Sequence, residues 1–263
     1  MLLNELVGGS VADARARAAE VPLDAVAAAA ERTPDALDAL AALAPADRVK
    51  IIAEVKRASP SRGRLADIAD PAALASLYEQ GGASAISVLT EQRRFLGSLD
   101  DLRAVRRSVS IPVLRKDFIA EPYQVYEARA AGADIVLLIV AALDQPTLVL
   151  LHELTVQLGM TALIETHSAE EVSRAVDAGA ALVGVNARDL DTFELDRDLF
   201  GSLADRIPSG VIRVAESAVL GPDDVAHYRE AGADVVLVGE ALVTGDPTAR
   251  LAEFLSVPIP DGK

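Results

Sequence analysis

The sequence predicts an α/β protein, a (β/α)8 (TIM) barrel with an N-terminal helical extension. The first observation behind this prediction is a repeated unit, in which the end of a helical stretch is followed by a glycine, small residues and an apolar run. The unit occurs four times: "EQGGASAISV" (79–88), "RAAGADIVLL" (129–138), "DAGAALVGV" (177–185) and "EAGADVVLVG" (230–239). Glycine suits the left-handed residue that ends a helix, and a short apolar run buried on both faces is typical of a parallel strand. A repeating βα unit is therefore indicated.

The second observation is the number of apolar runs. Four more lie between the repeats, "VKIIAEV" (49–55), "IPVLRKDF" (111–118), "MTALIET" (160–166) and "GVIRVAES" (210–217), which brings the strand candidates to eight. Helical stretches such as "PAALASLYEQ" and "PDDVAHYREA" alternate with them, and eight alternating units favour a closed barrel. The alternative is an open doubly wound sheet, but no G-x-G-x-x-G follows the first strand and no topological break is obvious.

The third observation concerns the two ends of the chain. Residues 1–45 are rich in alanine and have apolar positions for two or three helices, so we expect them to form an extension packed on a catalytic barrel of residues 46–263. With 263 residues, 51% of them hydrophobic, the chain can bury one substantial core.

Composition limits the partners. The 40 acidic and 25 basic residues give a formal net charge of −15, which disfavours binding to nucleic acid and to anionic membranes, so we expect a small-molecule partner. The chain has no cysteine, its start does not resemble a secretory signal, and its longest apolar run, residues 135–143, is too short to span a membrane. We expect a cytoplasmic monomer.

Polar and charged side chains stand at the carboxyl ends of five predicted strands, where barrel enzymes carry their catalytic groups: Glu54, Lys56 and Ser59; Lys116; Glu165; Asn186 and Arg188; Glu216 and Ser217. Residues two apart share a strand face, so both lysines and two or three glutamates would meet inside the mouth, while Arg115 and Asp117 would face the helices. Taken alone, each of these residues also has a purely structural explanation. A lysine near a strand end can extend to the solvent, a glutamate can form an ion pair, and an asparagine can form a turn. Their convergence favours an active site.

Lysine and glutamate held together can exchange protons with a substrate near neutral pH. We expect the apolar neighbours of Lys116 to make its proton easier to give up, and a lysine could alternatively form a Schiff base. We expect His152 and His227 to lie at the surface, whereas His167 could face either the site or a loop. No cluster of metal ligands is apparent, and the loops "ESAVLG" and "VGEALV" are candidates for holding phosphate.

The chain resembles the indole-3-glycerol phosphate synthases of the tryptophan pathway. The resemblance runs through "IIAEVKRASPSRG", "TEQRRFLGSLDDL", "ALIETH", "RVAES" and "VLVGEALV", and the most specific motifs are "LRKDF" and "GVNARDL". It implies conversion of 1-(2-carboxyphenylamino)-1-deoxyribulose 5-phosphate to indole-3-glycerol phosphate, with loss of carbon dioxide and water and without a cofactor or metal. Whether other enzymes of the pathway associate with the chain stays open.

The resemblance also implies roles for individual residues. Lys116 would be the general acid that protonates the substrate carbonyl, and Lys56 would assist the acid steps and contact anionic groups. Glu54 and Glu165 would move protons in an order that the sequence leaves open, and Asn186 would orient a hydroxyl or the glutamates. The substrate-binding residues would be Glu216 and Ser217 for the sugar-phosphate, Phe95, Phe118, Leu137 and Ile139 for the aromatic ring, Ser59 and Arg188 for the carboxylate, and the backbone of Ala218, Gly239 and Glu240 for the phosphate.

The chain departs from the family pattern at Ala218, where the family usually has glycine. Its methyl group would crowd the phosphate. Two other interpretations of the same residues are a Schiff-base aldolase or sugar-phosphate isomerase, and a binding barrel that has lost its chemistry.

Overall fold

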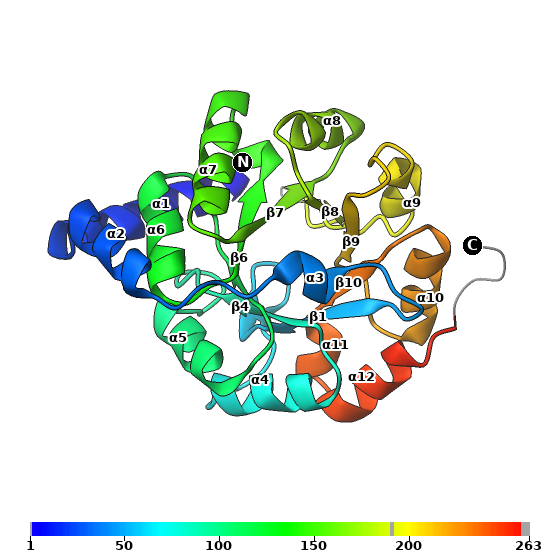
Figure 1. Cartoon of the computed structure of the whole chain (residues 1–263). Helices are drawn as coiled ribbons and strands as arrows, with labels where there is room; N and C mark the ends of the chain where they lie inside the picture. Colours follow the sequence, from blue (N-terminus) through cyan, green and yellow to red (C-terminus); the bar gives the residue numbers. More distant parts are fainter. Residues whose placement is uncertain (1, 190–191, 259–263) are drawn as a thin grey trace.

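The computed structural model describes residues 2–189 and 192–258, and within them eight parallel strands close into a barrel (Figure 1). The strands are β1 (Lys50–Val55), β4 (Ala85–Leu89), β5 (Val113–Lys116), β6 (Ile135–Ile139), β7 (Thr161–Thr166), β8 (Leu182–Asn186), β9 (Ile212–Glu216) and β10 (Val235–Val238). Each pairs with its neighbours in chain order, and β1 pairs with both β4 and β10, which closes the ring. The predicted barrel is confirmed, and each of the eight apolar runs contributes one strand.

Helices follow the strands around the outside of the barrel. They are α4 (Pro71–Gln80), α5 (Leu99–Ser108), α6 (Pro122–Ala130), α7 (Gln145–Gln157), α8 (Ala169–Asp177), α9 (Leu199–Ala204), α10 (Pro222–Glu230), α11 (Glu240–Val243) and α12 (Pro247–Leu255), with a short 3-10 helix η1 (Val140–Ala142). Side chains of Asp70, Ser98 and Ser168 accept N–H groups of the first turns of α4, α5 and α8. The glycine of every repeated unit has a positive φ, between 87° and 97°, because it turns the chain from helix to strand.

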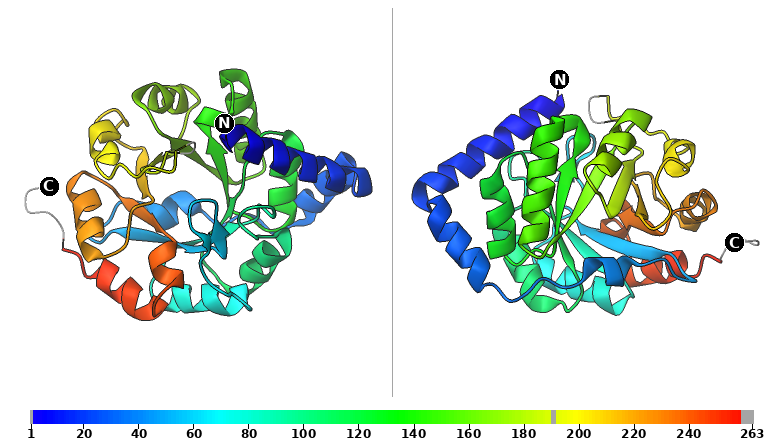
Figure 2. Two further views of the ribbon diagram at one scale, coloured as in Figure 1. Left: turned by 180° about the vertical axis from the view of Figure 1, so that it is seen from behind. Right: turned by 45° about the horizontal axis from the view of Figure 1, so that its top comes forward.

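The helices that precede β1 contact both ends of the barrel. α3 (Ala39–Leu43) buries Ala39 and Leu43 among the interior residues with which several strands begin, so it closes the amino-terminal end (Figure 1). α1 (Leu2–Glu20) lies at the opposite end, as the view from behind shows (Figure 2). α2 (Leu23–Arg32) lies between these two helices in the chain and packs against α6 on the outside.

Several polar contacts fix α1 to the barrel, among them an ion pair of Asp13 with Arg93. The Ser10 hydroxyl donates to Asp117 Oδ1 at 2.6 Å, and Arg17 pairs with Glu127 of α6 at 2.5 Å. Because Asp117 follows directly on Lys116, α1 is fastened to the carboxyl end of β5.

The loop after β1 contains a small hairpin that the sequence did not predict. β2 (Ala58–Ser59) pairs antiparallel with β3 (Gly63–Arg64), and Gly63 in the turn has φ +67°. The hairpin carries Ser59, Ser61 and Arg62 to the carboxyl end of the barrel. Within residues 2–189 and 192–258, no helix is both long and apolar enough to cross a membrane.

Candidate active site

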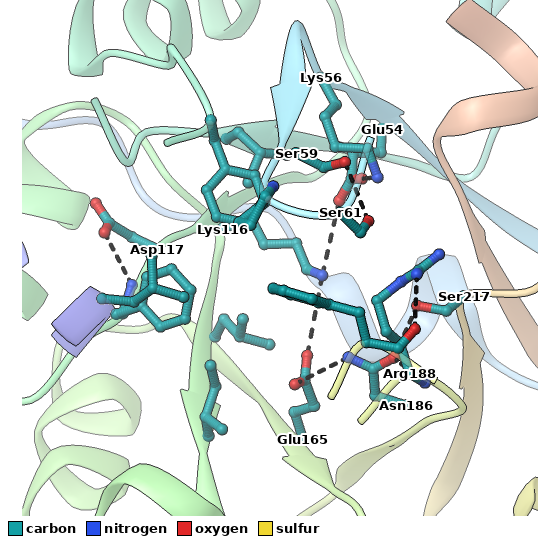
Figure 3. A pocket seen from close by; sticks show the side chains of 18 of the residues that line it. Glu54, Lys56, Ser59, Ser61, Lys116, Asp117, Glu165, Asn186, Arg188 and Ser217 are labelled. Carbon is teal, nitrogen blue, oxygen red and sulfur yellow. Dashed lines mark hydrogen bonds and ion pairs between the residues drawn. The ribbon is translucent and has the colours of Figure 1, made fainter. Parts of the chain in front are cut away.

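Lys116 lies at the centre of a group of carboxylates inside the carboxyl end of the barrel (Figure 3). Its Nζ atom is 3.4 Å from Glu216 Oε2, 3.7 Å from Glu54 Oε2 and 3.9 Å from Glu165 Oε2. These four side chains come from β5, β9, β1 and β7, and the alternation of each strand turns them inward. The structure therefore brings together the lysine and glutamates that the strand pattern placed on one face.

The same alternation turns the two neighbours of Lys116 outward. The Arg115 side chain is fully buried between the barrel and its helices, where it pairs with Asp117 and with Glu127 of α6, each at 3.0 Å. The Thr90 hydroxyl donates to Asp117 at 2.6 Å and accepts from Arg115 at 3.1 Å. Arg115 and Asp117 thus brace the strand that presents Lys116.

The pKa of Lys116 is raised, which contradicts the expectation from its apolar neighbours. Burial of the ammonium group favours the neutral amine, but Glu54, Glu216 and Glu165 together outweigh it. At Glu54, burial favours the neutral acid, but Lys56 Nζ at 2.7 Å and Lys116 overcome it and lower the pKa of the carboxyl. Lys116 is thus a cation at neutral pH, and its proton is given up only to a group of comparable basicity.

Glu216 differs from the other two glutamates in its proton affinity. Burial and the neighbouring Glu165 raise its pKa to about 8, against the effect of Lys116. Among the described residues, neither carboxylate oxygen of Glu216 has a hydrogen-bond partner. With its pKa raised to about 8, Glu216 holds a proton near neutral pH.

A hydrogen-bond chain orients Glu165. The Asn186 amide donates to Glu165 Oε1 at 3.1 Å, while its own carbonyl oxygen accepts from the Ser217 hydroxyl at 2.7 Å and from the Arg188 backbone at 3.0 Å. The direction of the Asn186 amide is thereby fixed, and with it the direction of the Glu165 carboxylate.

The cavity above this cluster has an apolar side and a polar side. Phe95, Phe118, Leu137 and Ile139 line the apolar side, as the sequence indicated, and the rings of Phe95 and Phe118 lie 6.0 Å apart. Leu6 of α1 completes this wall. The polar side is lined by Lys56, Ser59, Ser61, Asn186, Arg188, Ser217 and Glu240.

A second hollow adjoins the first between the loops after β9 and β10. It contains Ala218, Gly239 and Glu240, together with Lys56 and Ser217. Ser217 and Ala218 have φ values of +70° and +54°, a conformation that favours glycine and is strained in both residues. Arg62 from the hairpin reaches over this hollow and pairs with Glu240 at 2.9 Å.

Two glycines make room for site carboxylates, and only one of them, Gly239, was predicted from the sequence to belong to the site. A Cβ on Gly239 would lie 2.6 Å from Glu54 Oε1 and 3.0 Å from Lys56 Nζ, so this glycine accommodates the ion pair. A Cβ on Gly184, in the middle of β8, would collide with the Glu216 carboxylate. The signal for Gly184 was present, since a glycine inside the buried strand "LVGVN" marks a close approach.

Four further positions add to the predicted site. Ser87 donates to Glu54 Oε2 at 3.3 Å from the neighbouring strand β4, while Arg62 and Leu6 come from the hairpin and from α1, whose positions the sequence did not predict. His167 faces the site, with Nε2 3.4 Å from Glu165 Oε1. Glu216 lies beside Lys116 but does not line either hollow.

Comparisons with known proteins agree with the motifs. The family model "Indole-3-glycerol phosphate synthase" matches residues 3–254. The indole-3-glycerol phosphate synthase of Leifsonia xyli subsp. xyli is 70% identical over 97% of this chain and 98% of its own length, and that of Mycolicibacterium vanbaalenii is 61% identical over 97% and 94%. A thiamine phosphate pyrophosphorylase structure from Pyrococcus furiosus covers 80% of this chain and 94% of its own with a TM-score of 0.60 and 15% identity, which supports the fold alone.

The match to the family model extends over the barrel strands and the helices before them, and thus over every residue of the lysine and glutamate cluster. The resemblance seen in the motifs is confirmed. The chain belongs to the indole-3-glycerol phosphate synthase family, the carboxy-lyases that close the indole ring in tryptophan biosynthesis.

Proposed function

We propose that the Lys116 cluster carries out the ring closure, decarboxylation and dehydration of 1-(2-carboxyphenylamino)-1-deoxyribulose 5-phosphate. The observation that carries this assignment is the position of the Lys116 ammonium group, within 4 Å of three carboxylates and beside a cavity with one aromatic wall. An aromatic ring fits against Phe95 and Phe118, and a phosphate fits the hollow at Ala218 and Gly239.

In the first step the aromatic carbon that bears the carboxylate attacks the ketone carbon of the sugar chain. A carbon–carbon bond forms, the carbonyl π pair moves to oxygen, and Lys116 donates its proton to that oxygen. The raised pKa of Lys116 suits this step, because the developing alkoxide is itself strongly basic. The same raised pKa argues against a Schiff base, which needs the neutral amine as nucleophile.

In the second step the carboxylate leaves as carbon dioxide, and its bonding electrons restore the aromatic ring. A substrate carboxylate would lie against Ser59 and Arg188, which both line the cavity.

In the third step the new hydroxyl group leaves as water and a carbon-bound proton is lost. In this proposal the ion pair of Lys56 and Glu54, 2.7 Å long, supplies a proton to the departing hydroxyl, and Glu165, which accepts a hydrogen bond from Asn186, takes up the other proton. One proton enters the leaving water and one reaches a carboxylate, so the cluster returns to its starting charge once Lys116 is reprotonated.

We further propose that residues 1–45 act as a docked extension of the catalytic barrel, 46–263, and that the enzyme works as a cytoplasmic monomer on a small phosphorylated substrate. Residue 1 and residues 190–191 and 259–263 of these segments lie outside the described part of the chain. Leu6 supports the first point, because a side chain of the extension lines the cavity.

The direct test is to incubate the purified protein with the carboxyphenylamino substrate and to follow the absorbance or fluorescence of the indole product. We expect the wild-type protein, in which Ser59, Lys116 and Glu165 are unchanged, to form the indole product. A thermal unfolding curve recorded on the same sample establishes that the protein is folded. Folded protein that forms no product contradicts the proposal.

A further inference from the structure

His167 connects the Glu165 carboxylate to a second carboxylate at the start of α8. The imidazole follows directly on β7, and its Nδ1 atom is 3.3 Å from Glu171 Oε2, while its Nε2 atom is 3.4 Å from Glu165 Oε1. Glu171 Oε2 also accepts the backbone N–H of His167 at 2.8 Å, and the Glu171 N–H donates to Ser168 Oγ at 3.2 Å. The ring is therefore held by the amino end of a helix and aimed at the site.

The surroundings of Nε2 favour a proton on that atom. Nε2 is buried and has no hydrogen-bond partner within the described residues. With Nδ1–H donated to Glu171, a neutral ring would direct its Nε2 lone pair at a carboxylate oxygen of Glu165, and a protonated ring would direct an N–H there instead. Protonation thus replaces a repulsive contact with a charge-assisted one.

The charged groups around the ring come from four elements. Glu165 of β7, Glu171 of α8 and Glu216 of β9 are acidic, and the nearest cation of the cluster is Lys116 of β5, 3.9 Å from the opposite oxygen of Glu165. Burial favours the neutral ring, but hydrogen bonding to Glu171 and the charges of the three glutamates outweigh it and raise the pKa of His167 above its ordinary value.

We propose that His167 is a positioning residue that, as an imidazolium at Glu165 Oε1, holds Glu165 as the proton-accepting member of the neighbouring pair Glu165 and Glu216. This inference rests on the proposed function, in which Glu165 accepts a proton. Glu165 then lies between two cations, Lys116 at Oε2 and His167 at Oε1. Glu216 contacts Lys116 alone among these cations and carries the proton of the pair. His167 thereby decides which of two neighbouring glutamates works as the base.

The first test compares pH profiles of kcat/KM for the wild type, His167→Gln and His152→Gln. Glutamine keeps an N–H donor near Glu165 but cannot carry a charge, so it separates the charge from the hydrogen bond. We expect the acidic limb of the His167→Gln profile to move up by about 1 pH unit, and kcat/KM on that limb to fall roughly tenfold. An acidic limb that stays in the wild-type position overturns the proposal.

His152 provides the matched control. It is half-buried on α7, its Nδ1 is buried without a hydrogen-bond partner among the described residues, and its Nε2 lies beside Gly179, the glycine after α8, and not in the cavity. We expect His152→Gln to keep the wild-type profile. An equal shift in His152→Gln and His167→Gln would mean a general effect of losing a buried ring, and would overturn the proposal.

The second test measures the ring directly and needs no variant of His167. The chain has three histidines, so NMR signals of the imidazoles can be assigned with His152→Gln and His227→Gln proteins. We expect His167 to remain doubly protonated above pH 6.5 and to titrate at lower pH in the Glu165→Gln protein. A neutral His167 ring at pH 6.5 overturns the proposal.

The two tests separate this proposal from the proposed function. If Glu165→Gln retains full turnover, the role of Glu165 as base is wrong, and the positioning role of His167 falls with it even if the NMR titration shows the ion pair. If Glu165→Gln is inactive while His167→Gln keeps the wild-type profile, the proposed function stands and the inference about His167 alone is wrong.

Discussion

Gly184→Ala adds a single methyl group beside the Glu216 carboxylate inside the barrel. Gly184 lies in register with Glu165 on one side and Val214 on the other. A Cβ there would stand 3.2 Å from Glu216 Cδ and 3.3 Å from Leu163 Cδ1, and would overlap Glu216 Oε1. Glu216 is 1% exposed and its carboxylate lies 3.4 Å from Lys116 Nζ, so a displaced carboxylate disturbs the Lys116 cluster.

The expected loss of stability is that of an overpacked core, about 1–3 kcal/mol. In a chain of this length that corresponds to a fall in Tm of roughly 2–12 °C. Because the displaced carboxylate disturbs the Lys116 cluster, we also expect kcat to fall by roughly tenfold or more, the effect of about 1.4 kcal/mol on the barrier. Urea unfolding followed by circular dichroism measures the first effect, and the indole assay measures the second.

Two further variants identify the cause. Gly201→Ala in α9 places its Cβ 3.5 Å from the nearest atom, Ala231 Cβ, and should keep or raise the stability because alanine favours helix. Shortening the acid in the double variant Gly184→Ala/Glu216→Asp should restore at least half of the lost stability. Wild-type stability of Gly184→Ala, or a double variant no more stable than Gly184→Ala, would refute the steric explanation.

Three other outcomes follow from the site. Lys116→Ala should lower kcat by roughly two to four decades, as for a lost general acid, and turnover close to wild type in the indole assay would remove Lys116 from that role. Ala218→Gly relieves a residue at φ +54° and should lower KM for the phosphorylated substrate, with a gain in stability of up to about 1 kcal/mol; an unchanged or higher KM argues that the methyl group does not crowd the phosphate. Glu216→Gln removes a carboxyl whose pKa is raised from 4.5 to about 8 by burial and by Glu165. Folding favours the protonated form of Glu216, so it contributes stability to the wild type that is complete below pH 4.5 and lost as the pH rises to about 8. The free energy of unfolding of the variant should therefore rise relative to that of the wild type across this pH range. Parallel curves of unfolding free energy against pH would contradict this.

The strands and the inward set of residues could be predicted from local pattern alone. Residues two apart share a face whatever the rest of the chain does, so Leu114, Lys116 and Phe118 separate from Arg115 and Asp117 without knowledge of the fold. The glycine that ends each repeated helix is also a local signal, since its left-handed conformation is a property of one residue.

The pKa of Lys116 could not be predicted from local pattern. The apolar neighbours of Lys116 are two residues away in the sequence, whereas Glu54 and Glu216 are brought to it by strands far along the chain. The neighbours visible in the sequence gave the wrong direction for the pKa of Lys116, because the larger effect arises across the barrel. For the same reason the sequence could not show that Ser87 donates to Glu54, that Glu216 is the group beside Gly184, or that His167 faces Glu165.

The docking of α1 has a consequence for the order of events during synthesis. Ser10 meets Asp117, 107 residues later, and Arg17 meets Glu127, 110 residues later. At a translation rate of about 5–20 residues per second, α1 waits roughly 5–20 seconds for these partners. It therefore docks only after α4 and α5 have been made, and Leu6 takes its place in the cavity wall with it.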